Sequence, residues 1–248
     1  MQIEGTVALV TGANRGIGAA YVRALLDGGA AKVYAAARDP KRVTIEDARV
    51  VPLALDVTDP GQVAAAAAQA SDVALVISNA GIGRGTTALD DGAIEAARDE
   101  LEVNYFGVLH VARAFAPVLK ANGGGALVNM LSVVSWLHVP GMGTYAASKA
   151  AAWAATNALR VQLRGQGTQV VGVHVGYVDT DLTAGVTDPK SDPHEIAANV
   201  VAGIAAGAEE ILADEASEQV KSVLSNDLAT LYPGLQERYD AAQAAAAA

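Results

Sequence analysis

The chain has 248 residues, a net charge of −10 and no cysteine. The length and an apolar content of 52% suit one large α/β domain with a full core. The acidic charge and an aromatic content of 4% disfavour nucleic-acid binding, and the lack of cysteine excludes disulfides and thiolate metal sites. No signal peptide or membrane span is visible, so we expect a cytoplasmic protein without a membrane or nucleic-acid partner.

Short apolar strands alternate with Ala-rich helical stretches. The expected strands are Thr6–Thr11, Lys32–Ala37, Arg49–Leu55, Asp72–Ser78, Ala126–Met130, Gln169–Val175 and Ile211–Ala213. The expected helices are Gly16–Gly28, Pro60–Ala70, Glu95–Lys120, Thr144–Arg164, one that begins at Pro193, and Ser217–Leu224. This alternation predicts a single-domain, Rossmann-like, doubly wound parallel sheet with helices on both faces. The domain is expected over residues 1–240, with a substrate loop at about 176–192 and an Ala-rich tail at 241–248.

A glycine-rich turn, Thr-Gly-Ala-Asn-Arg-Gly-Ile-Gly, joins the first strand to the first helix. Glycines let the backbone approach a pyrophosphate, and free N–H groups at a helix start favour its negative charge. Three glycines alone are also typical of ordinary tight turns, so the flanking strand and helix carry the interpretation. The turn predicts a dinucleotide site that is formed by Gly12, Asn14, Arg15, Gly16, Ile17 and Gly18.

The end of the second strand indicates which dinucleotide binds. An acidic side chain there would accept hydrogen bonds from a ribose 2′-OH and repel a 2′-phosphate. The chain has Ala37 at this position, followed directly by Arg38, and Arg15 lies in the glycine turn. Two guanidinium groups can bracket a phosphate, although exposed arginines are common without any ligand. Asp39 is one residue further along and could pair with Lys41 or Arg42. We therefore expect NADP(H) as the cofactor.

A proton-transfer group is indicated by Tyr145 and Lys149, which share one face of a helix, and by Ser132, thirteen residues before the tyrosine. Bringing a tyrosine from a pKa near 10 towards 7 takes roughly 4 kcal/mol. A cation within about 4–6 Å can supply about 1–3 of those pKa units, and Lys149 is spaced to do so. Each residue taken alone has an ordinary structural explanation. Together, in this order, they favour a catalytic set in which Ser132 hydrogen-bonds the substrate oxygen.

These motifs resemble those of the short-chain dehydrogenase/reductase family: the T-G-x-x-x-G-x-G turn, Asn79-Ala80-Gly81 after the fourth strand, Asn104 within a helix, and the Ser132, Tyr145, Lys149 set. The resemblance covers roughly residues 5 to 182. It implies that Asn104 holds a water that links Lys149 to solvent. It also implies cofactor contacts by Asp56 and Val57 at the adenine, by Asn79, Ala80 and Gly81 at the ribose, and by Gly176, Val178 and Thr180 at the nicotinamide.

The sequence departs from the family pattern at three places. Val175 stands where proline usually precedes the glycine after the sixth strand, which predicts a less rigid turn. Ser78 replaces a usual asparagine. The glycine-rich ending of tetrameric relatives is missing, so we expect a homodimer through the helices at 95–120 and 144–164, with a homotetramer left open.

The substrate is expected to be a hydrophobic ketone or aldehyde, because the loops before Tyr145 and after Val175 carry apolar and aromatic residues. The expected pocket residues are Trp136, Leu137, Val139, Met142, Tyr177 and Val186. The predicted activity is reversible NADPH-dependent carbonyl reduction. The alternatives are an imine reductase, a hydroxysteroid-type dehydrogenase, and a non-catalytic NADP(H)-sensing protein. No metal site is expected, because the four histidines form no H-E-x-x-H pair.

Overall fold

The computed structural model describes residues 1–246, without the side chains at positions 227, 228, 242, 243 and 246. Its centre is a sheet of seven parallel strands in the order β3-β2-β1-β4-β5-β6-β7. The strands are β1 (Val7–Thr11), β2 (Lys32–Ala37), β3 (Val50–Ala54), β4 (Leu75–Ser78), β5 (Ala126–Met130), β6 (Gln169–His174) and β7 (Glu210–Leu212). The strand order reverses between β1 and β4, which confirms the predicted doubly wound parallel sheet.

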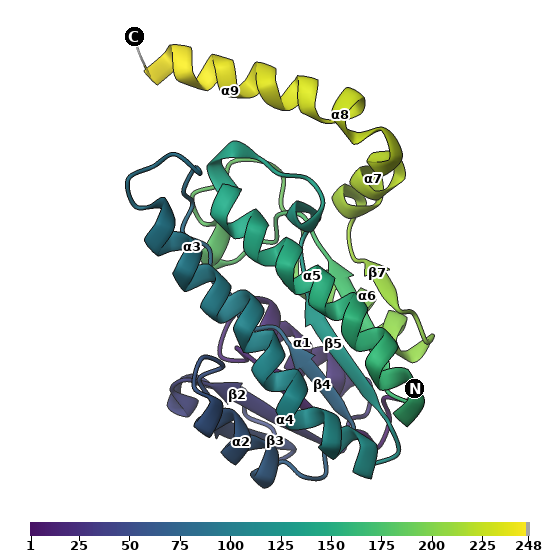
Figure 1. Cartoon of the computed structure of the whole chain (residues 1–248). Coiled ribbons are helices and arrows are strands. Elements are labelled where there is room, and N and C mark those ends of the chain that lie inside the picture. Colours follow the sequence, from purple (N-terminus) through teal and green to yellow (C-terminus); the bar gives the residue numbers. More distant parts are fainter. Residues whose placement is uncertain (247–248) are drawn as a thin grey trace.

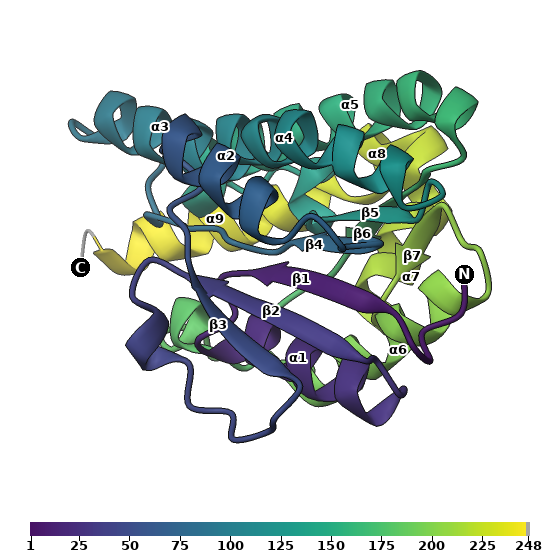
Figure 2. The ribbon, with the colours of Figure 1, turned by 90° about the horizontal axis from the view of Figure 1, so that it is seen from below.

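Helices cover both faces of this sheet (Figures 1 and 2). One face carries α1 (Gly16–Asp27) and α6 (Pro193–Ala205), and the other carries α2 (Pro60–Gln69), α4 (Gly107–Ala121) and α5 (Gly143–Leu163). The chain also forms short 3-10 turns at Pro40–Arg42, Val133–Ser135, Pro140–Met142, Arg164–Gln166, Asp181–Thr183 and Leu224–Asn226.

The two layers bury two separate apolar cores, one on each face of the sheet. Neighbouring residues of β1 show the alternation: Val10 belongs to the core with Tyr21 of α1, and Leu9 to the core with Phe115 of α4. All four side chains are fully buried. Each such side chain contributes about 1.5–3 kcal/mol on burial, so the strands are apolar on both faces rather than alternating with polar residues.

The expected helix at 95–120 is instead three segments. These are α3 (Ala93–Leu101), a π-helical turn over Glu102–Phe106, and α4. A single π turn often marks a functional position in a helix. Here it contains Asn104, and it ends at Gly107, where a Cβ would come within 2.8 Å of Val57 Cγ2. The sequence prediction missed this interruption because residues 95–120 keep a helical composition throughout.

Aspartates begin the later helices. Asp192 caps α6 by accepting a hydrogen bond from the N–H of His194 at 2.6 Å, and Asp214 caps α7 (Glu215–Val223). The chain continues through α8 (Asp227–Thr230) into α9 (Tyr232–Ala246), which lies across the top of the molecule in Figure 1. Thus α9 includes most of the predicted Ala-rich tail, whose last two residues are outside the described part. No helix in residues 1–246 has the length and apolarity needed to span a membrane.

Candidate active site

Side chains join the carboxyl ends of β1 and β4, where the strand order reverses. Thr11 Oγ1 accepts hydrogen bonds from the backbone N–H groups of Asn79 at 2.9 Å and Ala80 at 3.0 Å. Asn79 Nδ2 returns a bond to the carbonyl oxygen of Thr11 at 2.9 Å. Ligands of doubly wound sheets bind at this switch point, so Thr11 and Asn79 hold the two walls of the expected crevice together.

The turn after β1 requires glycine at three positions, because of the backbone conformation at two of them and a close contact at the third. Gly12 and Gly16 have φ of +66° and +52°, a region that favours glycine. A Cβ on Gly18 would collide with the carbonyl oxygen of Gly12 and come within 2.7 Å of Asn79 Nδ2. The helix α1 starts directly after Arg15, and no side chain caps its first N–H groups. The cradle therefore fits a pyrophosphate, whose charge an uncapped helix N-terminus favours.

The two arginines of the expected 2′-phosphate site differ in their surroundings. Arg38 is exposed after β2. Arg15 forms an ion pair with Asp181, a residue of the loop after β6. Asp39 accepts a hydrogen bond from the backbone N–H of Lys41 at 3.1 Å and caps a 3-10 turn. Asp39 thus serves the local turn, and Nη1 of the Arg15 guanidinium group is paired with Asp181.

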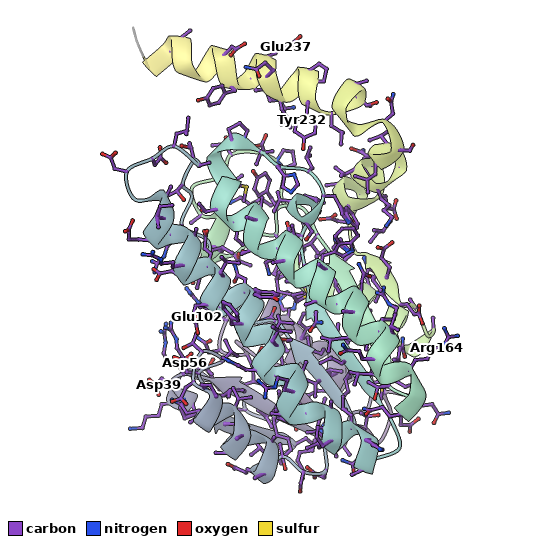
Figure 3. All side chains as sticks on the ribbon, in the orientation of Figure 1. Asp39, Asp56, Glu102, Arg164, Tyr232 and Glu237 are labelled. Carbon is purple, nitrogen blue, oxygen red and sulfur yellow. The ribbon has the colours of Figure 1, made fainter. Side chains whose placement is uncertain are left out.

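The expected adenine side lies at the end of β3, and Figure 3 shows Asp39 and Asp56 on the same side of the molecule. Asp56 Oδ1 accepts hydrogen bonds from the N–H and the hydroxyl of Thr58 at 3.0 and 2.8 Å. The carbonyl oxygen of Val57 lies 3.0 Å from His110 Nδ1. Asp56 therefore stabilises a turn, and the geometry shows this local role directly.

The structure brings Tyr145, Lys149, Asn104 and Gly81 together. Lys149 is 5% exposed, and its Nζ donates a hydrogen bond to the carbonyl oxygen of Met130 at 2.8 Å. The same Nζ lies 5.7 Å from the centre of the Tyr145 ring. A Cβ on Gly81 would lie 3.2 Å from Asn104 Oδ1 and 3.6 Å from Lys149 Nζ. Four residues from three separate segments thus surround one point at the carboxyl edge of the sheet.

Asn104 is held by hydrogen bonds on both ends of its amide. Its Oδ1 accepts from the N–H of Ile82 at 2.9 Å, and its Nδ2 donates to the Ile82 carbonyl oxygen and to Ser148 Oγ, both at 2.9 Å. The side chain is 1% exposed. The π turn aims this amide between α5 and the segment after β4, which explains why a regular helix is interrupted there.

Ser132 follows β5 and is 6% exposed. Its hydroxyl donates to the carbonyl oxygen of Val175 at 3.2 Å and accepts from the N–H of Val134 at 3.3 Å. The backbone of Ser132 is held from the other side, since His174 Nδ1 lies 3.1 Å from its carbonyl oxygen. Trp136 stacks on the His174 ring at a centroid distance of 3.6 Å and is 7% exposed. Trp136, one of the expected pocket residues, thus packs against the histidine that holds the Ser132 backbone.

Burial is the largest cause of the pKa changes of Tyr145 and Lys149. Desolvation raises the pKa of Tyr145, and the negative charge of Glu100 raises it further. Desolvation lowers the pKa of Lys149 to about 8. The direction for Tyr145 is opposite to the one expected from the sequence. The reason is that desolvation of the half-buried phenol outweighs the neighbouring ammonium group, which faces the ring and hydrogen-bonds the Met130 carbonyl oxygen.

The turn after β6 has a support that the sequence interpretation missed. Asp214 Oδ2 accepts hydrogen bonds from the N–H of Gly176 at 2.7 Å and from Ser191 Oγ at 3.3 Å. Val178 is buried beside this turn, and the side chain of Thr180 packs against Gly16, where a Cβ would lie 3.1 Å from Thr180 Cγ2. The carboxylate therefore restrains the turn that lacks proline. Asp214 follows the seventh strand as a single aspartate, and nothing in the sequence around it indicates this contact.

The remaining expected pocket residues are half-buried at the same edge: Leu137, Val139, Met142, Tyr177 and Val186. The Tyr177 hydroxyl reaches Met142 Sδ at 3.6 Å and so joins the two substrate loops. Two further residues belong beside them. A Cβ on Gly83 would lie 3.5 Å from Tyr145 Cδ2 and 3.6 Å from Leu182 Cδ1, and Leu182 is 54% exposed. Leu182 could have been noticed as an apolar residue just after Thr180.

Two other features lie outside this site. A groove of about 810 Å³ is formed by the N-terminal segment, α1 and α6, and none of the candidate site residues lines it. In the part of the chain that the structure describes, no cluster of three or more histidine or acidic side chains is arranged to hold a metal ion.

Comparison with known proteins agrees with the fold and the motifs. The family model of short chain dehydrogenase matches residues 6–191. The chain belongs to the short-chain dehydrogenase/reductase family, whose members are oxidoreductases acting on alcohol and carbonyl groups. It is 34% identical over 218 residues to 1-deoxy-11-beta-hydroxypentalenate dehydrogenase of Streptomyces exfoliatus, covering 82% of this chain and 79% of the relative. It is 31% identical over 223 residues to 3-oxoacyl-(acyl-carrier-protein) reductase of Escherichia coli, covering 85% and 88%.

Solved structures show the same similarity. A short chain dehydrogenase from Burkholderia cenocepacia in complex with NADP has a TM-score of 0.91 and 42% identity, covering 95% of this chain and 99% of that one. A short chain dehydrogenase/reductase from Burkholderia phymatum in complex with NAD has a TM-score of 0.83 and 25% identity, covering 92% and 95%.

Proposed function

We propose that the protein catalyses the reversible, NADPH-dependent reduction of a hydrophobic ketone or aldehyde to an alcohol. The observation that carries the proposal is the buried ammonium group of Lys149 against the Tyr145 ring, at the sheet edge that also bears the glycine turn. The bound nicotinamide would supply or accept the hydride. Tyr145, which keeps its proton in this environment, would deliver that proton to the carbonyl oxygen.

The other side chains assist this proton transfer. Lys149 stabilises the negative charge that remains on Tyr145 once its proton has left. The hydroxyl of Ser132 donates to the substrate oxygen as charge develops there, in place of its present bond to Val175. Asn104, fixed between Ile82 and Ser148, would hold the water through which Lys149 exchanges protons with solvent.

NADP(H) is favoured over NAD(H) by the charges at the end of β2. Ala37 offers no carboxylate to a ribose 2′-OH, while Arg38 is exposed and free to reach a phosphate. Arg15 would exchange Asp181 for the phosphate. Both partners of that pair are exposed, so breaking it costs only about 0–1 kcal/mol. The NADP complex of the Burkholderia cenocepacia relative, at 42% identity, supports the same choice.

The substrate class rests on the apolar side chains of the two substrate loops. Leu182 is exposed and lies with Tyr145 around Gly83, while Met142 and Tyr177 are half-buried and contact each other, and these side chains suit a hydrophobic carbonyl compound. The names of the relatives include a pentalenate dehydrogenase, an acyl-carrier-protein reductase and a galactitol dehydrogenase. What these names share is the interconversion of a hydroxyl and a carbonyl group, so we propose that chemistry and leave the rest of the substrate open. The cytoplasmic location expected from the sequence stays a prediction.

We further propose a homodimer through α4 and α5. Phe106, just before α4, is 43% exposed, and Val161 of α5 is 77% exposed. Both helices lie on the outside of the same layer (Figure 2). Single exposed apolar side chains are normal on a monomer, so the proposal rests on the outer face that the two helices form together, which a second copy would cover.

Tyr145→Phe tests the central assignment. The variant should fold and bind NADPH normally, while its turnover falls by about 10²–10⁴ because the proton donor is gone. The measurement is nicotinamide absorbance with aliphatic, aromatic and steroidal ketones, cyclic imines and both cofactors, beside cofactor titration by fluorescence. Near-normal turnover in the variant would remove Tyr145 as the donor. Tight NADPH binding without turnover of any compound by the wild type would favour the sensing protein.

A further inference from the structure

Glu100 of α3 is a buried carboxylate that the proposed reaction does not use. Its side chain is fully buried, and its Oε1 accepts a hydrogen bond from the backbone N–H of Arg84 at 2.6 Å. Within the described residues, its other oxygen, Oε2, has no hydrogen-bond partner. Burying a carboxylate is costly unless it is paired or fully hydrogen-bonded. A half-satisfied carboxylate beside a catalytic phenol is therefore a candidate for a role in the reaction.

Glu100 and Asn104 hold one segment of backbone between them. They are four residues apart, so both point from the same face of α3 and the π turn. Asn104 binds the N–H and the carbonyl oxygen of Ile82, and Glu100 binds the N–H of Arg84. Three backbone groups of residues 82–84 are thus held by two side chains. Asn104 has a proposed role in proton transfer, whereas nothing in that role accounts for Glu100.

The segment held in this way is the surface against which the phenol packs. Gly83 lies between the two anchored residues, and a Cβ there would lie 3.5 Å from Tyr145 Cδ2 and 3.8 Å from Cε2. The hydroxyl groups of Thr86 and Thr144 continue the contact with a hydrogen bond of 2.7 Å. Losing the Glu100 anchor would free one side of this surface, so the ring of Tyr145 would be less well positioned.

Two charges of opposite sign act on the phenol. Lys149 lies on α5 with its Nζ 5.7 Å from the ring centre, and Glu100 lies on α3 and is bound to the segment that packs against the ring. Arg98 and Glu102, on α3 and the π turn, are not buried, and two further charged groups on neighbouring segments are paired. Arg84 pairs with Asp99, and Arg15 of the glycine turn pairs with Asp181 of the loop after β6. Desolvation is the largest cause of the raised pKa of Tyr145, and the negative charge of Glu100 acts in the same direction, whereas the ammonium group of Lys149 is of the sign that favours the phenolate.

We propose that Glu100 is a positioning residue for Tyr145, which holds residues 82–84 against the phenol and keeps its proton in place by opposing the charge of Lys149. The proposal rests on the proposed role of Tyr145 as proton donor. A donor must carry its proton when the carbonyl compound arrives, so Glu100 favours carbonyl reduction near neutral pH. Alcohol oxidation, which needs the phenolate, is shifted to higher pH.

Glu100→Gln tests the charge while keeping an oxygen for the Arg84 N–H. Phenolate absorbance is titrated with NADP⁺ bound, and each protein is compared with its own Tyr145→Phe counterpart to isolate one of the seven tyrosines. We expect Glu100→Gln to lower the pKa of Tyr145 by about one unit. The pH of half-maximal alcohol oxidation should fall by a similar amount. Glu95→Gln, which neutralises an exposed carboxylate on the same helix, is the control and should leave both values unchanged.

Glu100→Leu tests the anchor, because leucine removes the hydrogen-bond acceptor as well as the charge. It should lower the rate of carbonyl reduction by about tenfold or more beyond Glu100→Gln, with an unchanged Kd for NADPH. A Tyr145 titration in Glu100→Gln that matches wild type and Glu95→Gln would overturn the proposal. So would Glu100→Leu with the same reduction rate as Glu100→Gln. If Tyr145→Phe keeps full turnover, the proposed function fails, but the phenolate titration still reports whether Glu100 acts on Tyr145.

Discussion

Burial decides the charge of single side chains around this site. Lys149 and His174 are both basic groups whose pKa is lowered because the charged form is poorly solvated, and Tyr145 is an acidic group whose pKa is raised for the same reason. The resting site therefore holds a protonated phenol and a neutral imidazole. Specific neighbours then adjust these values, as Glu100 does at Tyr145 and Ser132 at His174.

Arg38→Asp should move cofactor preference from NADPH towards NADH. The substitution removes a cation that can bind the 2′-phosphate and adds a carboxylate that can accept from a ribose 2′-OH. A hydrogen bond to a charged group contributes about 1.5–3 kcal/mol, so the ratio of kcat/KM values should change by roughly 10–100-fold. Arg42→Asp, at another exposed arginine of the same connection, is the matched control. Equal effects of the two variants would mean that the phosphate is held elsewhere.

His174→Asn should reveal a pH-dependent part of stability. Burial lowers the pKa of His174 from 6.5 to about 4, so between these values the unfolded chain binds a proton that the folded chain does not. The contribution is fully present above pH 6.5 and is lost as pH falls to about 4, amounting to about 3 kcal/mol in the free energy of unfolding. Asparagine keeps an N–H for the Ser132 carbonyl oxygen but does not titrate.

Urea unfolding from pH 7.5 to pH 4.5 measures this contribution. The stability of the wild type relative to His174→Asn should decline steadily as the solution is acidified. His194→Asn, at an exposed histidine of α6, is the comparison variant. A constant difference between wild type and His174→Asn across this range would show that His174 does not remain neutral in the folded protein.

The carboxylate of Asp214 connects two elements, the start of α7 and the turn after β6. Asp214 caps α7 by accepting from the N–H of Ser217 at 2.9 Å, and its second oxygen holds the turn after β6 through Gly176. This connection explains how the turn stays ordered although Val175 replaces proline. The cap of one helix thereby restrains the loop that carries Val178 and Thr180.

Asp214→Ala should weaken both the protein and its cofactor site. Loss of a helix cap costs about 0.5–2 kcal/mol, and the freed turn should raise the Kd for NADP⁺ by up to about tenfold. Asp192→Ala removes the cap of α6, where its carboxylate accepts from His194, and is the control for a cap without the turn contact. Denaturant unfolding gives the stability and fluorescence titration the Kd. Equal Kd values for the two variants would contradict the role of Asp214 in the turn.

The whole molecule is a sheet with two cores, and its outer surface still carries exposed apolar side chains. Val161 belongs to α5 and Phe106 directly precedes α4, and these two helices cover the face of the sheet opposite to the one that α1 covers. Assembly through this face would leave the carboxyl edge of the sheet open to cofactor and substrate. The homodimer is thus compatible with catalysis in each subunit.

Val161→Asp should dissociate the proposed homodimer. The side chain is 77% exposed in the single chain, so the monomer should tolerate the charge, whereas an apolar interface would not. Light scattering after size exclusion measures the mass. Leu89→Asp, at a 93% exposed leucine in the loop before α3, should leave the mass unchanged. A Val161→Asp protein of dimer mass would exclude this face as the interface.

Local spacing along the chain determined the strands, the glycine turn and the pairing of Tyr145 with Lys149, because periodicity and short-range geometry are properties of consecutive residues. The tertiary structure decided what neighbours each group has: Asp181 at Arg15, Asp214 at Gly176, and His174 at Trp136. It also reversed the expected pKa direction of Tyr145, since the burial of that phenol and the approach of Glu100 depend on how α3 packs against α5. Solvation and long-range contacts arise only when the layers assemble.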